Sequence, residues 1–142
     1  MNEAARRLGV ALPIVQAPVG SVTTPALAAA VSNAGGLGTL AGTWRSPAEL
    51  RRVLLETRAL TSRPIGVNLV LAFDVRPHLD AVLEEGVRII SFFWGDPTPW
   101  IPRVHAPFHG ECGFFDRSDG MEDDTTGGVN ARNPWCWVTP EE

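Results

Sequence analysis

One stretch, residues 13–41, most constrains how this chain can fold, because it predicts strand, turn, helix, turn and strand in succession. Residues 14–17 are a short apolar run between two prolines, which suits a buried strand. The segment 25–34 begins with a proline, is rich in alanine and is followed by a glycine pair, which together favour a helix with a defined end. A second strand, 37–41, follows. Two strands joined by one helix predict a βαβ unit with parallel strands.

The same alternation continues to about residue 106. Ser46 and the proline after it predict the start of a second helix, and Arg63-Pro64 its end. The chain has 142 residues, whereas a complete eightfold barrel typically needs about 250. We therefore predict an α/β fold of about four βα units followed by an irregular tail, and the strand spacing fits either a partial (β/α) barrel or a doubly wound sheet. The further predicted segments are helix 46–60, strand 65–71, helix 74–85, strand 87–94 and a helix starting at 100–106.

Composition changes abruptly after residue 106. Arginine and acidic residues balance to +2 in 1–106 and to −6 in 107–142, and the second segment shows neither helical periodicity nor strand alternation. We predict two regions: 1–106, which carries the βα units, and 107–142, an irregular, acidic tail rich in glycine and aspartate. The tail fits a reading-frame change, a disordered extension or a small added module, and we favour the first.

Charge and hydropathy narrow the classes of partner. The formal net charge is −4, so neither nucleic acid nor an anionic membrane is an expected partner. No apolar run reaches membrane-spanning length, and the first residues lack the apolar core of a secretory signal. Two cysteines do not make a disulfide framework. We expect a soluble, cytoplasmic protein.

Asn68 interrupts the otherwise apolar strand 65–71. A buried amide must find hydrogen-bond partners or it destabilises the fold. One interpretation is a strand-end asparagine bonded to loop backbone. The other is a ligand contact, because barrel strands deliver polar groups to the rim at their carboxyl ends.

The histidines and cysteines give no strong catalytic or metal candidate. His105, His109 and Cys112 have spacing that could place metal ligands together, but a proline between them breaks the helix and no fourth ligand follows. Cys136 has no basic neighbour that would lower the pKa of its thiol. His78 falls at a predicted helix start, where we expect a surface residue. We predict no metal site and name no catalytic residue.

Two motifs carry a resemblance to a known family. Residues 14–20 are Ile-Val-Gln-Ala-Pro-Val-Gly, and residues 28–38 are Ala-Ala-Ala-Val-Ser-Asn-Ala-Gly-Gly-Leu-Gly. Both motifs, at this spacing, resemble the opening of the nitronate monooxygenase (2-nitropropane dioxygenase) family. The resemblance implies that residues 1–106 are the N-terminal half of a TIM barrel that binds FMN, and it stops after residue 106.

The resemblance also implies which residues contact the cofactor. Val19 and Gly20 correspond to the turn beside the flavin ring, and Asn68 to the asparagine of a Gly-Val-Asn-Leu strand that contacts the flavin. The chain departs from the family at three places: Val19 stands where methionine is usual, Ser21 where a second glycine is usual, and Trp94 where phenylalanine is usual.

The activity that the resemblance implies is oxidation of an alkyl nitronate by O₂ to a carbonyl compound and nitrite. The family's catalytic base is a histidine in a Gly-Gly-His segment, and here Gly127-Gly128 is followed by Val129. No base can therefore be carried over. The alternatives are a relative of FMN-dependent enoyl-acyl-carrier reductases, or a barrel fragment without enzymatic activity that self-associates through exposed strand edges.

Overall fold

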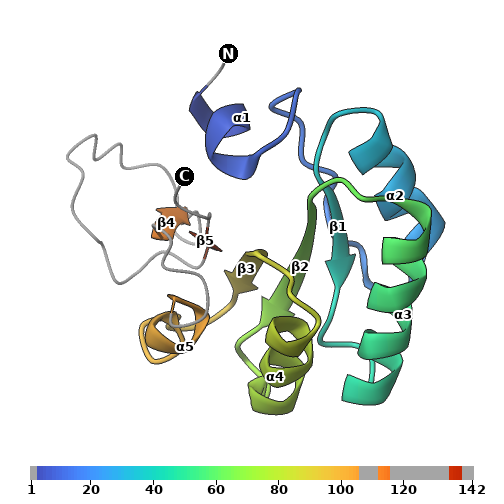
Figure 1. The fold of residues 1–142 in the computed structure, drawn as a ribbon. Helices are drawn as coiled ribbons and strands as arrows, with labels where there is room; N and C mark the ends of the chain where they lie inside the picture. Colours follow the sequence, from blue (N-terminus) through green and yellow to red (C-terminus); the bar gives the residue numbers. More distant parts are fainter. Residues whose placement is uncertain (1–2, 106–111, 116–134, 139–142) are drawn as a thin grey trace.

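A parallel three-stranded sheet lies at the centre of the computed structural model, which describes residues 3–105, 112–115 and 135–138. The sheet contains β1 (Gly38–Ala41), β2 (Ile65–Val70) and β3 (Ile89–Phe93) in this spatial order (Figure 1). Strands that follow one another along the chain are therefore neighbours in the sheet, as in the wall of a (β/α) barrel. This arrangement confirms the predicted α/β fold.

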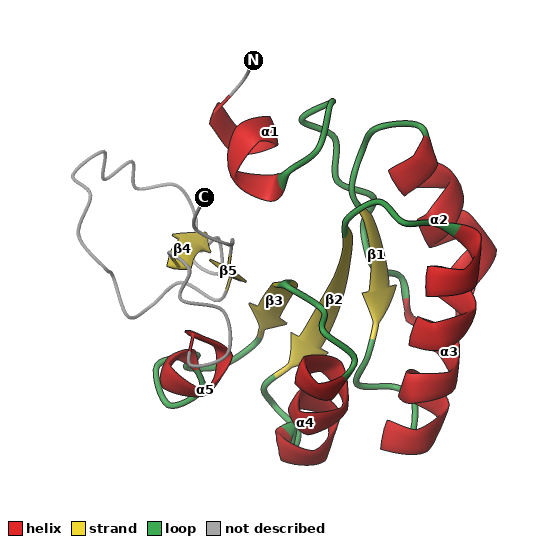
Figure 2. Cartoon of the chain, in the orientation of Figure 1, coloured by secondary structure: helices red, strands yellow, loops and turns green. Residues whose placement is uncertain are grey.

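Helices connect the strands and cover one side of the sheet, as Figure 2 shows. α2 (Pro25–Asn33) leads into β1, while α3 (Pro47–Leu60) and α4 (Arg76–Glu84) connect β1 to β2 and β2 to β3. α2 packs on α3 and α3 packs on α4. α5 (Ile101–His105) follows β3, and its Val104 is buried in the same core. Within the described residues, none of the helices combines the length and the apolar character that crossing a membrane requires.

The predicted helix starts are confirmed by their capping hydrogen bonds. The Thr24 hydroxyl accepts from the backbone N–H of Leu27 at 3.2 Å, at the start of α2. The Ser46 hydroxyl accepts from the backbone N–H of Glu49 at 3.2 Å, at the start of α3. A proline occupies the first turn of each helix, where its missing N–H leaves no hydrogen bond unmade. Local sequence alone therefore specifies where both helices begin.

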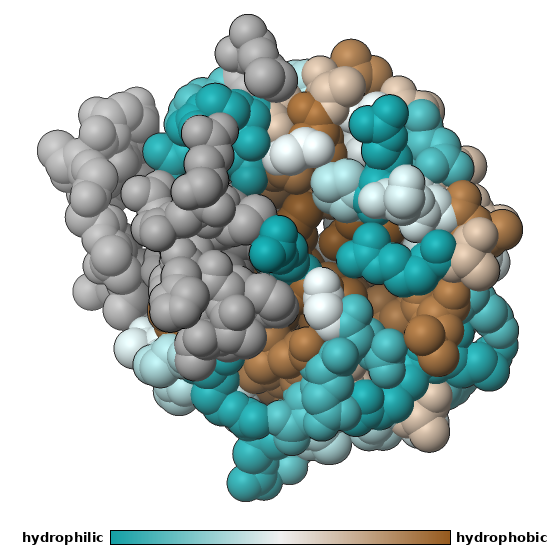
Figure 3. All heavy atoms as spheres, in the orientation of Figure 1, coloured by the Kyte–Doolittle hydropathy of each residue, from teal (hydrophilic) through white to brown (hydrophobic). Residues whose placement is uncertain are grey.

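The main core lies between the sheet and the helices. Side chains alternate across a strand, so β2 turns Ile65, Val67 and Leu69 toward the helices, and β3 turns Ile90 and Phe92 the same way. All five are at most 1% exposed. Figure 3 shows hydrophobic residues gathered in the middle of the view, with hydrophilic residues around them. The helix residues in this cluster are Ala28, Leu50, Val53, Leu54, Leu79, Val82 and Val104.

α1 (Glu3–Leu8) packs against the amino ends of the strands, where a second buried cluster forms. Ala5 and Val10 contribute from the N-terminal segment, and Leu37 and Ile89 contribute from the starts of β1 and β3. Residues 3–8 thus form a short helix beside the sheet. Its apolar side closes the end of the sheet opposite to the rim where barrel enzymes bind ligands.

Acid should weaken the ion pairs of α1. Hydrogen bonds from Arg6 and Arg7 to Glu3 lower the pKa of that carboxyl from its usual 4.5 to about 2. Because the pKa is lower in the folded chain, the stabilisation is complete above pH 4.5 and is lost as the pH falls through about 2. Carboxyl-carbon NMR of Glu3 should give a midpoint near 2, and an Arg6→Met/Arg7→Met variant should raise it toward 4.5. A wild-type midpoint near 4.5 would contradict this pairing.

α2 and β1 approach each other closely at Gly38. A Cβ atom at this position would lie 1.9 Å from the backbone oxygen of Ala28 in α2. Ser32, which is 1% exposed, accepts a hydrogen bond from the Gly38 N–H at 3.0 Å and donates its own proton to the Pro64 carbonyl at 2.7 Å. One buried hydroxyl thus ties α2 both to β1 and to the loop before β2.

The first predicted strand, residues 14–17, is wrong as a buried strand. In the structure it forms one isolated parallel bridge, between Val15 and Leu37, and Val15 is 39% exposed. The described parallel sheet therefore has three strands rather than four. We refer to residues 14–17 as the bridge segment, because they still lie beside the start of β1.

Two residues explain why the bridge segment does not continue as a strand. Pro18 has no N–H, so it cannot donate the next hydrogen bond of a parallel ladder. The Thr39 N–H bonds to the side-chain oxygen of Gln16 at 3.1 Å rather than to backbone, while the Thr39 hydroxyl donates to the Gln16 carbonyl. The Gln16 side chain therefore takes the place of a backbone hydrogen bond at the point where Pro18 interrupts the ladder.

The sequence predicts no strand in residues 107–142, and this is wrong for two short segments. β4 (Cys112–Phe115) and β5 (Trp135–Val138) pair as an antiparallel two-stranded sheet, and β5 lies against β3. Aromatic residues favour strands, but four residues are too few to show a clear alternation. The domain boundary after residue 106, and the origin of the tail, stay predictions.

Candidate functional site

A band of polar side chains lies on the face of the sheet that is turned away from the helices. Thr39, Asn68 and Ser91 are buried on this face of β1, β2 and β3, where they alternate with the apolar core residues. Gln16 of the bridge segment extends the band beside β1. The register places Asn68 between Ala41, the last residue of β1, and Ser91, in the middle of β3, so the band extends toward the carboxyl ends of the strands. This is the end of a barrel that carries the active site.

The Asn68 side chain finds its hydrogen-bond partners on the neighbouring strand. Its amide nitrogen donates to the Ser91 hydroxyl at 2.9 Å and to the Ser91 carbonyl at 3.3 Å. The sequence left open whether this amide bonds loop backbone or a ligand, and the observed partner is β3. These contacts hold the side chain in one orientation on the inner face. Its contact with a flavin stays a prediction.

The predicted cofactor turn at Val19 and Gly20 has a backbone held by a buried threonine. The Thr23 hydroxyl accepts from the Val19 N–H at 2.8 Å, and the Thr23 N–H donates back to the Val19 carbonyl at 3.2 Å. Thr23 is 1% exposed, whereas the Val19 side chain is 55% exposed. Gly20 begins the short 3₁₀ turn η1 (Gly20–Val22) with φ of +41°, and no atom lies within 4 Å of where its Cβ would be. The turn is therefore fixed in shape and open on one side.

Arg45 joins this turn to the rest of the rim. Its guanidinium donates to the carbonyls of Ala41, at the end of β1, and of Thr23, the latter at 3.1 Å. The Nε2 atom of His78, in α4, donates to the Arg45 carbonyl at 2.7 Å. His78 is thus half-buried instead of lying on the surface as predicted. Hydrogen bonds therefore link α4 through Arg45 to Thr23, which holds the turn in place.

Within residues 3–105 no carboxylate pairs with Arg45, and the partners of its guanidinium there are backbone carbonyls. The Nδ1 atom of His78 is buried and finds no partner in the same part of the chain. The Arg45 guanidinium lies beside the predicted cofactor turn, and its charge makes this part of the rim favourable for an anion. Because Nε2 of His78 donates, its Nδ1 atom is an acceptor and adds nothing to the binding of an anion.

The remaining sequence candidates lie outside the residues whose side chains the structure describes. They are the His105 and Cys112 side chains, His109 and the Cys136 thiol. In the described residues, no three histidine, cysteine, aspartate or glutamate side chains gather as metal ligands. The expectation that the site holds no metal stays a prediction.

Five residues of the site were missed from the sequence: Gln16, Thr23, Thr39, Arg45 and Ser91. Strand alternation could have found Ser91, because it shares the inner face of the sheet with Asn68. Arg45 has no local signal, since its partner Thr23 lies 22 residues earlier in the chain. Gln16 and Thr39 meet across 23 residues and are equally hidden from a local pattern.

Comparison with known proteins identifies the family. A family model described as nitronate monooxygenase matches residues 3–79, more than half of the chain. The chain belongs to the nitronate monooxygenase family. The matched residues include all three predicted cofactor contacts and the complete Arg45–Thr23–His78 network.

Curated relatives with this name are similar over part of the chain. A nitronate monooxygenase of Paraburkholderia phytofirmans is 49% identical over 79 residues, 55% of this chain and 21% of the relative. One from Pseudomonas aeruginosa is 55% identical over 64 residues, 45% of this chain and 18% of the relative. A Rhodococcus jostii protein named (3aS,4S,5R,7aS)-5-hydroxy-7a-methyl-1-oxo-octahydro-1H-indene-4-carboxyl-CoA dehydrogenase is 41% identical over 100 residues, 70% of this chain and 28% of the relative. The chain thus spans less than a third of these relatives' length.

Solved structures confirm the partial TIM barrel. FabK from Thermotoga maritima superposes with a TM-score of 0.72 at 33% identity, over 75% of this chain and 34% of that chain. Nitroalkane oxidase from Streptomyces ansochromogenes superposes with a TM-score of 0.57 at 26% identity, over 70% of this chain and 40% of that chain. The three described parallel strands and their helices therefore correspond to part of a barrel wall.

Proposed function

We propose that this chain carries the N-terminal part of an FMN site, and that the enzyme built on it oxidises alkyl nitronates with O₂ to a carbonyl compound and nitrite. The observation that supports this most is the turn at Val19 and Gly20. It is held rigidly by Thr23, is open on one side and lies within the segment that matches the nitronate monooxygenase family. Family membership supports the reaction, and the inner polar band supports the position of the site.

The residues present fit a flavin. A flat ring system needs backbone that it can approach closely, and the open side of Gly20 offers that approach. A flavin also has a polar edge, and the oriented amide of Asn68 can bond such an edge. Val19, Gly20 and Asn68 are the residues that would hold FMN. When bound, FMN supplies the electron transfer between nitronate and O₂.

The chain's own residues would orient the reactants. Thr23 and Arg45 keep the cofactor turn in one conformation, which lowers the conformational cost of binding. The charge of Arg45, which no described carboxylate balances, favours the approach of an anionic nitronate. No described residue is assigned as the base.

Paired glycine variants test the flavin site. Gly20 and Gly86 both have positive φ values, +41° and +68°, and at neither position does an atom lie within 4 Å of where a Cβ would be. A valine should therefore strain the backbone similarly at both. We expect Gly20→Val to weaken FMN binding at least about tenfold in a flavin-fluorescence titration, because the side chain fills the open side of the turn. Gly86→Val should leave FMN affinity unchanged, and equal losses in both variants would contradict the site.

A second candidate function follows from the Rhodococcus jostii relative, whose name is that of a dehydrogenase acting on a CoA thioester. It agrees with the alternative of an FMN-dependent reductase of enoyl thioesters. Nitrite release with O₂ consumption supports nitronate oxidation, whereas NADH consumption with an enoyl thioester supports the alternative. Absence of FMN binding would support a barrel fragment without activity, and light scattering would then measure its self-association.

A cytoplasmic location and the absence of nucleic-acid partners stay predictions from the sequence.

A further inference from the structure

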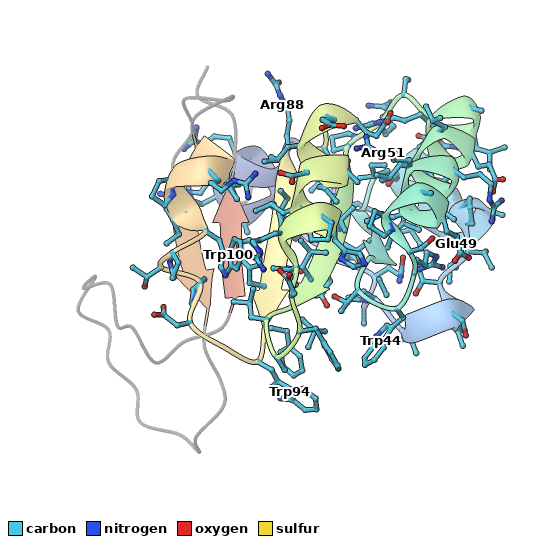
Figure 4. All side chains as sticks on the ribbon, turned by 90° about the horizontal axis from the view of Figure 1, so that it is seen from below. Trp44, Glu49, Arg51, Arg88, Trp94 and Trp100 are labelled. Atoms are coloured by element: carbon cyan, nitrogen blue, oxygen red, sulfur yellow. The ribbon has the colours of Figure 1, made fainter. Side chains whose placement is uncertain are left out.

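Each loop that follows a strand or the bridge segment exposes a large apolar side chain at the carboxyl ends of the strands. The bridge segment is followed by Val22, β1 by Trp44, β2 by Phe73 and β3 by Trp94, with exposed fractions of 69%, 59%, 50% and 60%. Figure 4 shows Trp44 and Trp94 at one end of the molecule and Arg88, which precedes β3, at the opposite end. We call Trp44, Phe73 and Trp94 the aromatic rim.

The rings of the aromatic rim are held by one another and by β3. Trp44 and Phe73 meet edge to face, with ring centroids 5.4 Å apart and planes inclined by 71°. Trp94 stacks on Phe93 with centroids 4.9 Å apart and planes inclined by 22°. Both arrangements are favourable aromatic geometries. The rings are therefore partly ordered although at least half of each rim side chain stays exposed.

Trp94 has a backbone conformation that a bulky residue rarely adopts. Its φ is +54°, and Gly95 follows at +154°. A Cβ at Gly95 would lie 2.6 Å from Leu71 Cβ, so the loop after β3 is pressed against the loop after β2. The left-handed conformation is unfavourable for an L-residue, and the exposed indole gains little from burial in return. Such strain at an exposed ring indicates a binding role.

Charged side chains beside the aromatic rim are already engaged. Arg76 binds both carboxylate oxygens of Asp74, at 2.9 and 2.7 Å, and lowers the pKa of that carboxyl to about 2. Asp96 accepts a hydrogen bond from the Thr98 N–H at 2.9 Å. The Arg45 guanidinium, next to Trp44, donates to the backbone carbonyls of Ala41 and Thr23, so the exposed side chains of the aromatic rim themselves offer ring faces and edges. An uncharged ring fits this chemistry better than an ionic group.

We propose that the aromatic rim is a subsite for an apolar ring of the substrate, so that the enzyme prefers nitronates that carry a ring over short alkyl nitronates. This deepens the proposed function and rests on it for the nitronate, while the ring-binding subsite itself does not require FMN. The aromatic rim lies at the same end of the strands as the predicted cofactor turn. A substrate whose ring is bound at the rim would therefore have its nitronate group directed toward the flavin site.

The indole N–H signals of the ¹⁵N-labelled chain test the subsite without flavin. Benzyl alcohol should shift the Trp44 and Trp94 signals saturably and leave the signal of Trp100, which packs against the core, unchanged. n-Butanol, which has no ring, should bind at least about tenfold more weakly. Equal shifts with both alcohols, or no saturable shift with benzyl alcohol, would overturn the proposal.

Variants separate ring binding from folding. Trp44→Leu/Trp94→Leu should weaken benzyl alcohol binding about tenfold, measured through the Phe73 ring signals. The matched control is Leu55→Ala/Leu60→Ala, which removes two apolar side chains that are 59% and 52% exposed on α3, and it should bind as the wild type does. Glycine adopts a positive φ without strain, so the melting temperature of Trp94→Gly should stay equal to that of the wild type or rise. Its binding of benzyl alcohol should fall. Unchanged binding in Trp94→Gly would overturn the role of Trp94.

Competition links the subsite to the substrate. The nitronate of phenylnitromethane should displace benzyl alcohol at lower concentration than the nitronate of nitroethane does. Equal displacement would overturn the substrate preference while leaving the FMN titration unaffected. If FMN fails to bind but benzyl alcohol still binds at the rim, the proposed function fails and the ring subsite stands.

Discussion

Replacing Gly38 by alanine should strongly destabilise this fold, although it adds only one methyl group. The new Cβ would lie 1.9 Å from the Ala28 carbonyl, which belongs to backbone and cannot rotate away. α2 must then move off β1, and the hydrogen bond from Gly38 to Ser32 is lost with it. We expect the free energy of unfolding to fall by about 3 kcal/mol. Urea unfolding followed by circular dichroism would measure it.

Gly86→Ala is the control for backbone effects. Gly86 has φ of +68° and no atom within 4 Å of a Cβ position, so alanine there adds conformational strain without a clash. The free energy of unfolding of this variant should fall by about 1 kcal/mol. If Gly38→Ala lowered the free energy of unfolding no more than Gly86→Ala does, the close packing of α2 on β1 would be wrong.

Asn68→Leu should weaken both folding and flavin binding. Leucine has a similar volume but no donor, so it leaves the buried Ser91 hydroxyl and carbonyl without the Asn68 amide. We expect a loss of about 2 kcal/mol in the free energy of unfolding, because a buried polar group left unpaired retains its desolvation cost. FMN affinity, measured by fluorescence titration, should fall at least about tenfold if the amide also bonds the flavin.

A second substitution separates these two roles of Asn68. Asn68→Leu/Ser91→Ala removes the hydroxyl that the single variant leaves unpaired, so it should regain much of the lost stability. FMN binding should stay weak, because the flavin contact is still missing. Recovery of FMN affinity together with stability would show that Asn68 only connects β2 to β3.

The elements that the sequence predicted correctly are those with local signals. Ser46 with its following proline marks the start of α3, and the apolar run at 65–70 gives β2 directly. A cap acts within three residues and a buried strand shows as a continuous apolar run, so neither depends on a distant partner. The motif around Val19 and Gly20 likewise sufficed to indicate the family.

The parts that the sequence did not predict depend on distant partners. The bridge segment has the composition of a strand, but Pro18 and the Gln16 side chain end its ladder against β1. Arg45 is one of several arginines in the sequence, and only the fold brings its guanidinium to Thr23. The orientation of Asn68 is set by Ser91, which follows 23 residues later. Such pairings follow from topology and leave no local pattern.

The match between sequence order and spatial order in the sheet has a consequence for biosynthesis. β1, β2 and β3 lie side by side in the order in which the ribosome produces them. Each new strand therefore pairs with one that has already emerged, and none must wait for a distant partner. The length of chain between two pairing strands stays short, which lowers the entropy cost of bringing them together and favours rapid folding. The wall of the barrel can thus grow during translation, one βα unit at a time.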